Sequence, residues 1–184
     1  MRVNIHLVPC AQLQDALLFL NNRIVQETHL NGVRFTDHKP HLTVLMFDIN
    51  SIDESKHCLV ASAEAARFHC PCQLTNLQPH VDQGFLMLKV DLSASLKQLC
   101  KVVWESCSHM LPPWDEWRVD FEHYEPHITI AVAENHEQLQ QEHVDLAEEF
   151  LNCFCKQCPD SILICDQVDV SVVGPHGTVS GTLL

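Results

Sequence analysis

Two five-residue segments of this chain have nearly the same sequence: Pro-His-Leu-Thr-Val at 40–44 and Pro-His-Ile-Thr-Ile at 126–130. In a strand, alternate side chains share a face. The His and the Thr of each segment would therefore point one way and the aliphatic residues the other. One copy is ordinary polarity on a half-exposed sheet. Two copies predict a pair of similar strands, each presenting an imidazole and a hydroxyl group.

The surroundings of the two segments also correspond. An apolar strand comes first, at 3–8 before the first motif and at 85–90 before the second. In both cases a helix with one apolar stripe follows, then the motif strand, then a second helix. The helix after the first motif has capping-box spacing at 51–54 and extends through Arg67, and the helix after the second begins at 135–138 and extends to about Cys155. The two stripes are Leu13, Leu17, Leu20 and Ile24, and Leu96, Leu99, Val103, Cys107 and Met110.

Two hairpins complete the expected fold. Segments 73–80 and 85–91 flank a turn-like stretch at 81–84, and segments 162–173 and 178–184 flank Gly174 to Gly177. Tight turns imply antiparallel pairing, and helices must cover one face of each sheet. We expect an α+β fold with two lobes related by a pseudo-twofold axis. Each lobe would hold an antiparallel sheet with outer helices, and the motif strands would face each other across a central groove.

No linker rich in Gly, Ser or Pro separates the halves. We therefore expect one bilobal domain over residues 1–184, with pseudo-repeats at roughly 1–80 and 81–184. A chain of 184 residues is long enough for one substantial core. Strands exchanged between the lobes are compatible with this order, and a monomer is favoured.

The net charge of −13 repels polyanions at long range. Tight binding to a long nucleic-acid duplex needs many Lys and Arg contacts and is not expected. A nucleotide or a short oligonucleotide remains compatible, because a few local donors can bind it.

Ten cysteines without a secretory signal predict reduced thiols in a cytoplasmic protein. The clusters at 70–72 and 153–158 lack a second Cys or His pair at zinc-finger spacing, so buried or scattered thiols are the favoured interpretation over a zinc site. No apolar stretch is long enough to span a membrane, and no membrane association is expected.

Two imidazoles on opposite sides of one phosphorus centre supply a base for the attacking oxygen and an acid for the leaving oxygen. Hydroxyl groups beside them can donate to the non-bridging oxygens, which gain charge in the transition state. His41 and His127 are the candidate catalytic residues, and Thr43 and Thr129 the candidate phosphate-binding residues. This scheme requires no metal and no cofactor.

The duplicated His-x-Thr-x motif, with its apolar flanks and the order of strands and helices, resembles the 2H phosphoesterase superfamily. That superfamily includes LigT-like RNA ligases and cyclic phosphodiesterases. The resemblance implies that His41 and His127 are the catalytic pair and that Thr43 and Thr129 hold the phosphate. It also implies action on 2′,3′-cyclic phosphates, 2′-5′ linkages or RNA 3′ ends, generally without a metal.

Four further residues near the motifs are candidate substrate contacts. Lys39 and Tyr124 directly precede the motifs and could reach a phosphate or a base, although a solvated lysine and a packed tyrosine are the simpler interpretations. Trp117 and Arg118 lie in an expected loop, where the aromatic ring could stack on a nucleobase.

The leading functional hypothesis is a metal-independent phosphodiesterase. It would hydrolyse a 2′,3′-cyclic phosphate or a 2′-5′ phosphodiester of a nucleotide or short RNA. Two alternatives use the same groove: a non-catalytic sensor or scaffold that binds AMP-like nucleotides, and an enzyme that ligates RNA ends or trims RNA 3′ ends.

Overall fold

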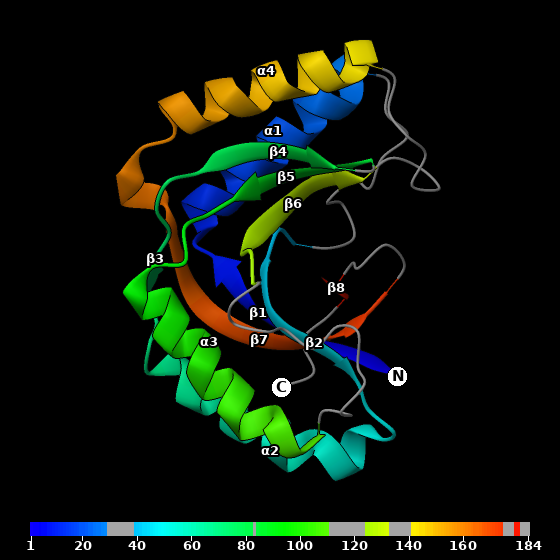
Figure 1. Ribbon diagram of the computed structural model, residues 1–184, viewed down its shortest axis with the longest axis vertical. Coiled ribbons are helices and arrows are strands. Elements are labelled where there is room, and N and C mark those ends of the chain that lie inside the picture. The colour runs from blue at the N-terminus through cyan, green and yellow to red at the C-terminus, as the bar shows by residue number, and fades with distance from the viewer. Residues whose placement is uncertain (29–38, 83, 111–123, 133–140, 175–178, 181–184) are drawn as a thin grey trace.

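The computed structural model describes residues 1–28, 39–82, 84–110, 124–132, 141–174 and 179–180. In chain order the main elements are β1 (Arg2–Pro9), α1 (Ala11–Thr28), β2 (Leu42–Asp48), α2 (Ile52–Arg67), β3 (Cys72–Gln73), β4 (Gln78–Asp82), β5 (Phe85–Lys89), α3 (Ala94–Cys107), β6 (His127–Val132), α4 (Gln141–Gln157), β7 (Ile164–Val173) and β8 (Val179–Ser180). Short 3-10 turns follow α3 at Ser108–Met110 and precede β7 at Asp160–Ile162. The expected α+β class is confirmed (Figure 1).

The strands form one bent antiparallel sheet in the order β3-β7-β1-β2-β6-β5-β4, with β8 paired to β7. The two expected sheets are its halves: β3, β7, β1 and β2 make the first half-sheet, and β6, β5 and β4 make the second. In the described residues the halves join through a single register pair, Leu42 with Ile128. The two motif strands are thus neighbours at the middle of the sheet.

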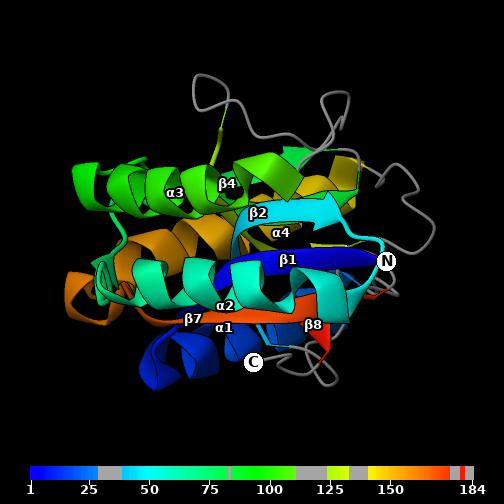
Figure 2. The same ribbon diagram turned by 90° about the horizontal axis from the view of Figure 1, so that it is seen from below.

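The helices cover the half-sheets in an exchanged arrangement. Helix α1 follows β1 of the first half-sheet but packs on β6 and α4, whereas α3 follows β5 of the second half-sheet but packs on β2 and α2. The remaining helices match this pattern, since α2 packs on β7 and α4 on β4. Figure 1 shows α2 and α3 covering one side and α1 and α4 the other, and Figure 2 shows α2 and α3 lying side by side. The duplication of the fold and the boundaries of the pseudo-repeats stay predictions.

No helix in the described ranges combines the length and the apolar character that crossing a membrane would need.

Each motif strand contains a β-bulge at the residue directly after the motif threonine. On β2, Leu45 pairs with Ile5 and Thr43 with His6, so Val44 is the extra residue. On β6, Ala131 pairs with Leu86 and Thr129 with Met87, which makes Ile130 the extra residue. A bulge changes the alternation of faces, so Val44 and Leu45 are both buried, as are Ile130 and Ala131. The same irregularity in both copies bends both motif strands at the same place.

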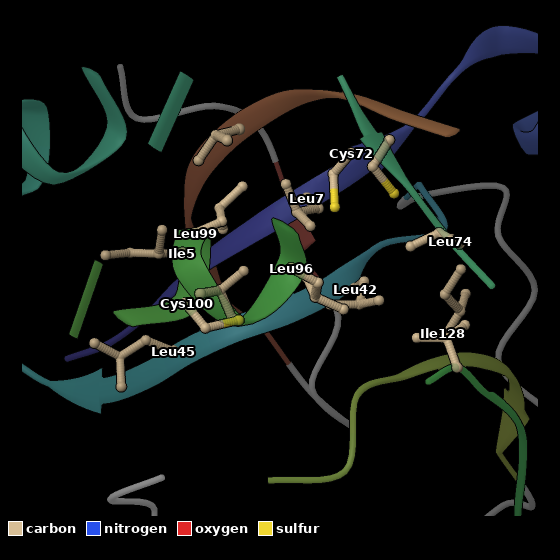
Figure 3. Close-up of a cluster of buried hydrophobic side chains, with 14 of the residues drawn as sticks. Ile5, Leu7, Leu42, Leu45, Cys72, Leu74, Leu96, Leu99, Cys100 and Ile128 are labelled. Atoms are coloured by element: carbon tan, nitrogen blue, oxygen red, sulfur yellow. The ribbon is translucent and has the colours of Figure 1, made fainter. Parts of the chain in front are cut away.

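The faces of the motif strands opposite the histidines and threonines pack into one apolar core. Leu42 and Ile128 are essentially inaccessible to solvent, and α3 packs Leu96, Leu99 and Cys100 into the same cluster (Figure 3). Burial of each large aliphatic side chain stabilises the fold by about 1.5–3 kcal/mol. From α1, the buried Asn21 side chain donates to the carbonyl oxygen of Ile130 at 2.5 Å. The core therefore fixes the backbone from which the motif side chains project.

The predicted helix starts and hairpin turns agree in part with the structure. Ser51 is the N-cap residue of α2, but its side chain makes no capping hydrogen bond. The expected start of the last helix at 135–138 lies outside the described residues, and α4 is described from Gln141. In the first hairpin the strands are shifted from the expected ranges, because Asp82 already pairs with Phe85. Gly84 closes that turn with φ of 85°, a value that favours glycine.

Candidate active site

The register of β2 and β6 places the two motifs side by side in opposite directions. Leu42 pairs with Ile128, and the antiparallel register continued by one residue puts His41 level with Thr129, and Thr43 level with His127. Because Leu42 and Ile128 point into the core, their neighbours point to the other face of the sheet. The two imidazoles and the two hydroxyl groups therefore occupy alternating corners of one small area.

The two motifs also have the same burial pattern. The proline and the two aliphatic residues of each motif are buried, whereas the histidine and the threonine are half-buried. This is the alternation predicted from the sequence, and it leaves the polar face partly accessible in both copies.

Both motif histidines have the same ring orientation. The Nδ1 atom of His41 lies 3.1 Å from the carbonyl oxygen of Lys39, and that of His127 lies 2.9 Å from the carbonyl oxygen of Glu125. A carbonyl oxygen only accepts, so Nδ1 carries the proton in both rings. In the neutral rings Nε2 is then unprotonated and carries the lone pair, as proton transfer to that atom requires.

Two residues that the sequence interpretation missed stand beside His41. The buried Asn4 of β1 donates from Nδ2 to Thr43 Oγ1 at 2.9 Å, and its Nδ2 lies 3.4 Å from His41 Nε2. The buried His6, two residues on, sets its ring at 65° to that of His41, with the centroids 5.0 Å apart. The signal in the sequence was two polar side chains two residues apart in an otherwise apolar strand.

The Oδ1 atom of Asn4 is buried and has no hydrogen-bond partner within the described structure. Burying an unpaired amide oxygen costs about 1–3 kcal/mol. An unpaired buried atom of this kind is uncommon in native folds. In this protein it belongs to the side chain that contacts both His41 and Thr43 of the first motif.

The pKa of His41 depends on burial and on the neighbouring histidines. The pKa of His41 is lowered from 6.5 to about 4, first by burial and then by the like charge of His6, with a further contribution from His127. The hydrogen bond to Lys39 acts in the opposite direction. This coupling agrees with the strand register, which sets the two imidazoles on neighbouring strands. That both rings reach one phosphate stays a prediction.

An ion pair lies beside His127. Lys89 of β5 is the register partner of His127, and its Nζ lies 2.5 Å from a carboxylate oxygen of Glu125. This lysine lowers the pKa of Glu125, with smaller contributions from His80 and His127. The half of the site around His127 is thus charged, whereas the half around His41 contains an amide and a second imidazole.

The four candidate substrate contacts lie in different surroundings. Lys39 is exposed, and its carbonyl oxygen serves His41. The hydroxyl of Tyr124 donates to the carbonyl oxygen of Thr43 at 2.6 Å, and burial raises the pKa of this phenol well above its usual value. Tyr124 therefore links the segment before the second motif to the strand of the first. Its role as a substrate contact stays a prediction. Trp117 and Arg118 lie outside the described residues.

The described residues contain no group of three His, Cys, Asp or Glu side chains that could hold a metal ion. Cys72 is buried, Cys70 is half-buried and Cys153 is exposed. Burial raises the pKa of the Cys70 thiol to about 11 and that of Cys100 to about 12, so both thiols are neutral near pH 7.

Comparison with known sequences identifies the family. The family model described as the 2′-5′ RNA ligase superfamily matches residues 10–156, a range that includes both motifs. The chain belongs to this superfamily, the 2H phosphoesterases. No curated protein matches the chain.

Several solved structures share the fold. A protein of Thermus thermophilus matches with a TM-score of 0.61 and 15% identity over 100% of this chain and 96% of its own. Escherichia coli LigT matches with a TM-score of 0.50 and 14% identity over 76% of this chain and 75% of its own. Usb1 of Kluyveromyces marxianus has the same TM-score and identity over 93% of both chains. At these identities the likeness shows the fold alone.

Proposed function

We propose that this 2H phosphoesterase hydrolyses a phosphodiester of a nucleotide or short RNA, either a 2′,3′-cyclic phosphate or a 2′-5′ linkage. The observation that carries the proposal is the matched orientation of the two motif imidazoles. Each histidine is fixed through Nδ1 to a backbone carbonyl oxygen, and the two rings lie on one face of neighbouring strands.

Paired imidazoles supply both proton transfers of the reaction. One Nε2 accepts a proton from the attacking water, while the other donates a proton to the departing ribose oxygen. A new bond forms between the water oxygen and phosphorus, and the bond from phosphorus to the ribose oxygen breaks. The two rings exchange their protonation states in the reaction, and proton exchange with solvent resets them.

The threonine hydroxyls are suited to the phosphate oxygens. Thr43 Oγ1 already accepts from Asn4, so its own proton is available for a non-bridging oxygen of the substrate. Thr129 occupies the corresponding position in the second motif and is half-buried. Two donors aimed at oxygens that gain charge lower the barrier selectively.

The charge of the chain supports a small substrate. With a net charge of −13, extended contact with an RNA backbone is unfavourable. A cyclic nucleotide or a dinucleotide needs only the few donors that the two motifs provide.

The experiment is product analysis on a panel of adenosine 2′,3′-cyclic phosphate, 2′-5′-linked diadenosine and its 3′-5′ isomer, with 5′-phosphorylated RNA ends for ligation. The intact protein is compared with a variant that carries His41→Ala and His127→Ala. We expect hydrolysis of at least one of the first two substrates by the intact protein, and none by the double variant.

Each other result contradicts the proposal in its own way. Binding of AMP with no product from any substrate would identify a sensor or scaffold. Joined RNA ends would identify a ligase, and equal turnover by the double variant would place the chemistry elsewhere.

A further inference from the structure

The two halves of the site differ at matched positions of the sheet. On β1, His6 pairs with the motif residue Thr43, and Asn4 precedes it by two residues. On β5, Met87 pairs with the motif residue Thr129, and Phe85 precedes it by two residues. The motifs are nearly identical, but only the first has a polar amide and a second imidazole at these positions.

The amide of Asn4 favours one protonation state of His41. Because Nδ1 of His41 donates to the carbonyl oxygen of Lys39, Nε2 is an acceptor in the neutral ring. The Nδ2 atom of Asn4, a donor, lies 3.4 Å from it. Protonation of Nε2 would place two donors against each other and lose this contact. The same amide donates to Thr43 Oγ1, which leaves the threonine proton for a ligand.

The ring of His6 acts in the same direction. It is buried, lies edge to face against His41, and has its own Nδ1 3.3 Å from the carbonyl oxygen of Asn4. Burial lowers the pKa of His6 to about 4, so its ring is neutral near pH 7. A positive charge on His41 would be desolvated by this neighbour, and two positive rings at this distance would repel each other.

We propose that Asn4 and His6 are positioning residues that make His41 the general base and leave His127 as the general acid. This assignment rests on the proposed function, because it gives each histidine one of the two roles in that reaction.

The surroundings of the two rings agree with this division. His41 is faced by His6 from β1 and by His127 from β6. From the other face of β2, α3 contributes the core residues Leu96, Leu99 and Cys100. His127 instead has the Lys89–Glu125 ion pair beside it. An unprotonated Nε2 at rest suits a base, and a phosphodiester anion bound beside His41 would stabilise the imidazolium that forms during proton abstraction.

In the reaction, water gives its proton to Nε2 of His41 as its oxygen bonds to phosphorus. Nε2 of His127 gives its proton to the departing ribose oxygen as the bond from that oxygen to phosphorus breaks. The products are a ribose hydroxyl and a phosphomonoester, and the rings leave with protonation states opposite to those they began with.

A change of leaving group separates the two roles. Adenosine 2′-(4-nitrophenyl phosphate) releases a phenolate that needs no proton, whereas 2′-5′-linked diadenosine releases a ribose oxygen that does. We expect His127→Ala to keep turnover of the nitrophenyl ester within about ten-fold of the intact protein and to lose about a hundred-fold or more on the dinucleotide. His41→Ala should lose turnover of both substrates. The reverse pattern, or equal losses in the two variants, would overturn the assignment.

A second measurement is independent of turnover. The titration of His41, followed through its imidazole nitrogens by NMR, should show the Nδ1–H tautomer and a pKa near 4. Asn4→Asp should raise this pKa by more than one unit, because a carboxylate accepts from the imidazolium. If that variant does not fold, Asn4→Leu should raise the pKa as well, because it removes the donor. Met87→Leu, on β5 at the position that corresponds to His6, should leave the titration of His41 unchanged.

These readouts separate two failures. If the intact protein turns over no substrate but His41 titrates as expected, the proposed function is wrong and the influence of Asn4 on His41 stands. A pKa of His41 at the ordinary value of about 6.5 in the intact protein would mean that Asn4 offers its oxygen to the ring. That result, or a titration that Asn4→Asp leaves unmoved, would overturn the inference.

Discussion

The hydroxyl of Tyr124 donates a hydrogen bond of 2.6 Å to the main-chain carbonyl oxygen of Thr43. It ties the segment before the second motif to the strand of the first. Tyr124→Phe should leave this carbonyl oxygen without its partner and lower the free energy of unfolding by about 1–3 kcal/mol. Urea titration of both proteins checks the value. Equal stability would mean that solvent replaces the bond at no cost.

Removal of either motif imidazole should stop catalysis without unfolding the protein. His41→Ala and His127→Ala should each lower kcat by about a hundred-fold or more, since each removes one proton transfer. Steady-state kinetics on the substrate identified by product analysis measures the loss, and circular dichroism verifies the fold. The control is His143→Ala on α4, which should keep the rate of the intact protein. A near-normal rate in either motif variant would contradict the paired role.

The threonine hydroxyls should matter for the rate more than for binding. Thr43→Val and Thr129→Val keep the shape of the side chain and remove the donor. Each should lower kcat by about a hundred-fold, because the phosphate oxygens need the donor most in the transition state. Serine at the same positions restores the hydroxyl and should recover most of the rate. A rise in KM alone, with kcat unchanged, would mean that these groups bind the ground state and transition state equally.

Activity should not depend on a bound metal ion. The mechanism assigns both proton transfers and the stabilisation of the phosphate to side chains, so turnover should persist after dialysis against EDTA. The rate is measured with and without added Mg²⁺ or Mn²⁺. Loss of activity in EDTA that a divalent cation restores would replace this mechanism with a metal-assisted one.

Acid should destabilise the fold through the buried ring of His6. Its pKa is lowered from 6.5 to about 4, first by burial, so below pH 6.5 the unfolded chain binds a proton that the folded protein does not. Stability should fall as the pH decreases from about 6.5 to about 4, by about 3 kcal/mol from this ring, and His6 should add no further loss below that. Urea unfolding at a series of pH values tests this. In His6→Phe the decline should be smaller by that amount. If the stability of the intact protein does not change between pH 6.5 and pH 4, this effect of His6 is excluded.

The repeated order of strands and helices was predictable because each element has a clear local period. The stripes of α1 and α3 and the alternation in both motifs follow directly from residue spacing. Pairing across the sheet was not predictable in the same way. The junction of Leu42 with Ile128 and the bulges at Val44 and Ile130 depend on contacts between distant segments.

The same limit explains which site residues the sequence interpretation found. His41 and His127 are marked by repetition. Asn4 and His6 occur once, in a strand that reads as apolar, and their importance comes from the register of β1 with β2. Lys89 likewise joins the site only through its pairing with His127. Local pattern therefore identifies the repeated motif residues, and only three-dimensional pairing shows where the surroundings of the two motifs differ.

The exchange of α1 and α3 means that neither half of the chain keeps all of its packing partners. A fragment ending near residue 80 would keep α1 but lose β6 and α4, on which that helix packs, and its own β2 would lose the cover of α3. Apolar faces would then be exposed on both fragments. Reassembly of two separately produced fragments, rather than independent folding of each, is the behaviour that this interleaving favours.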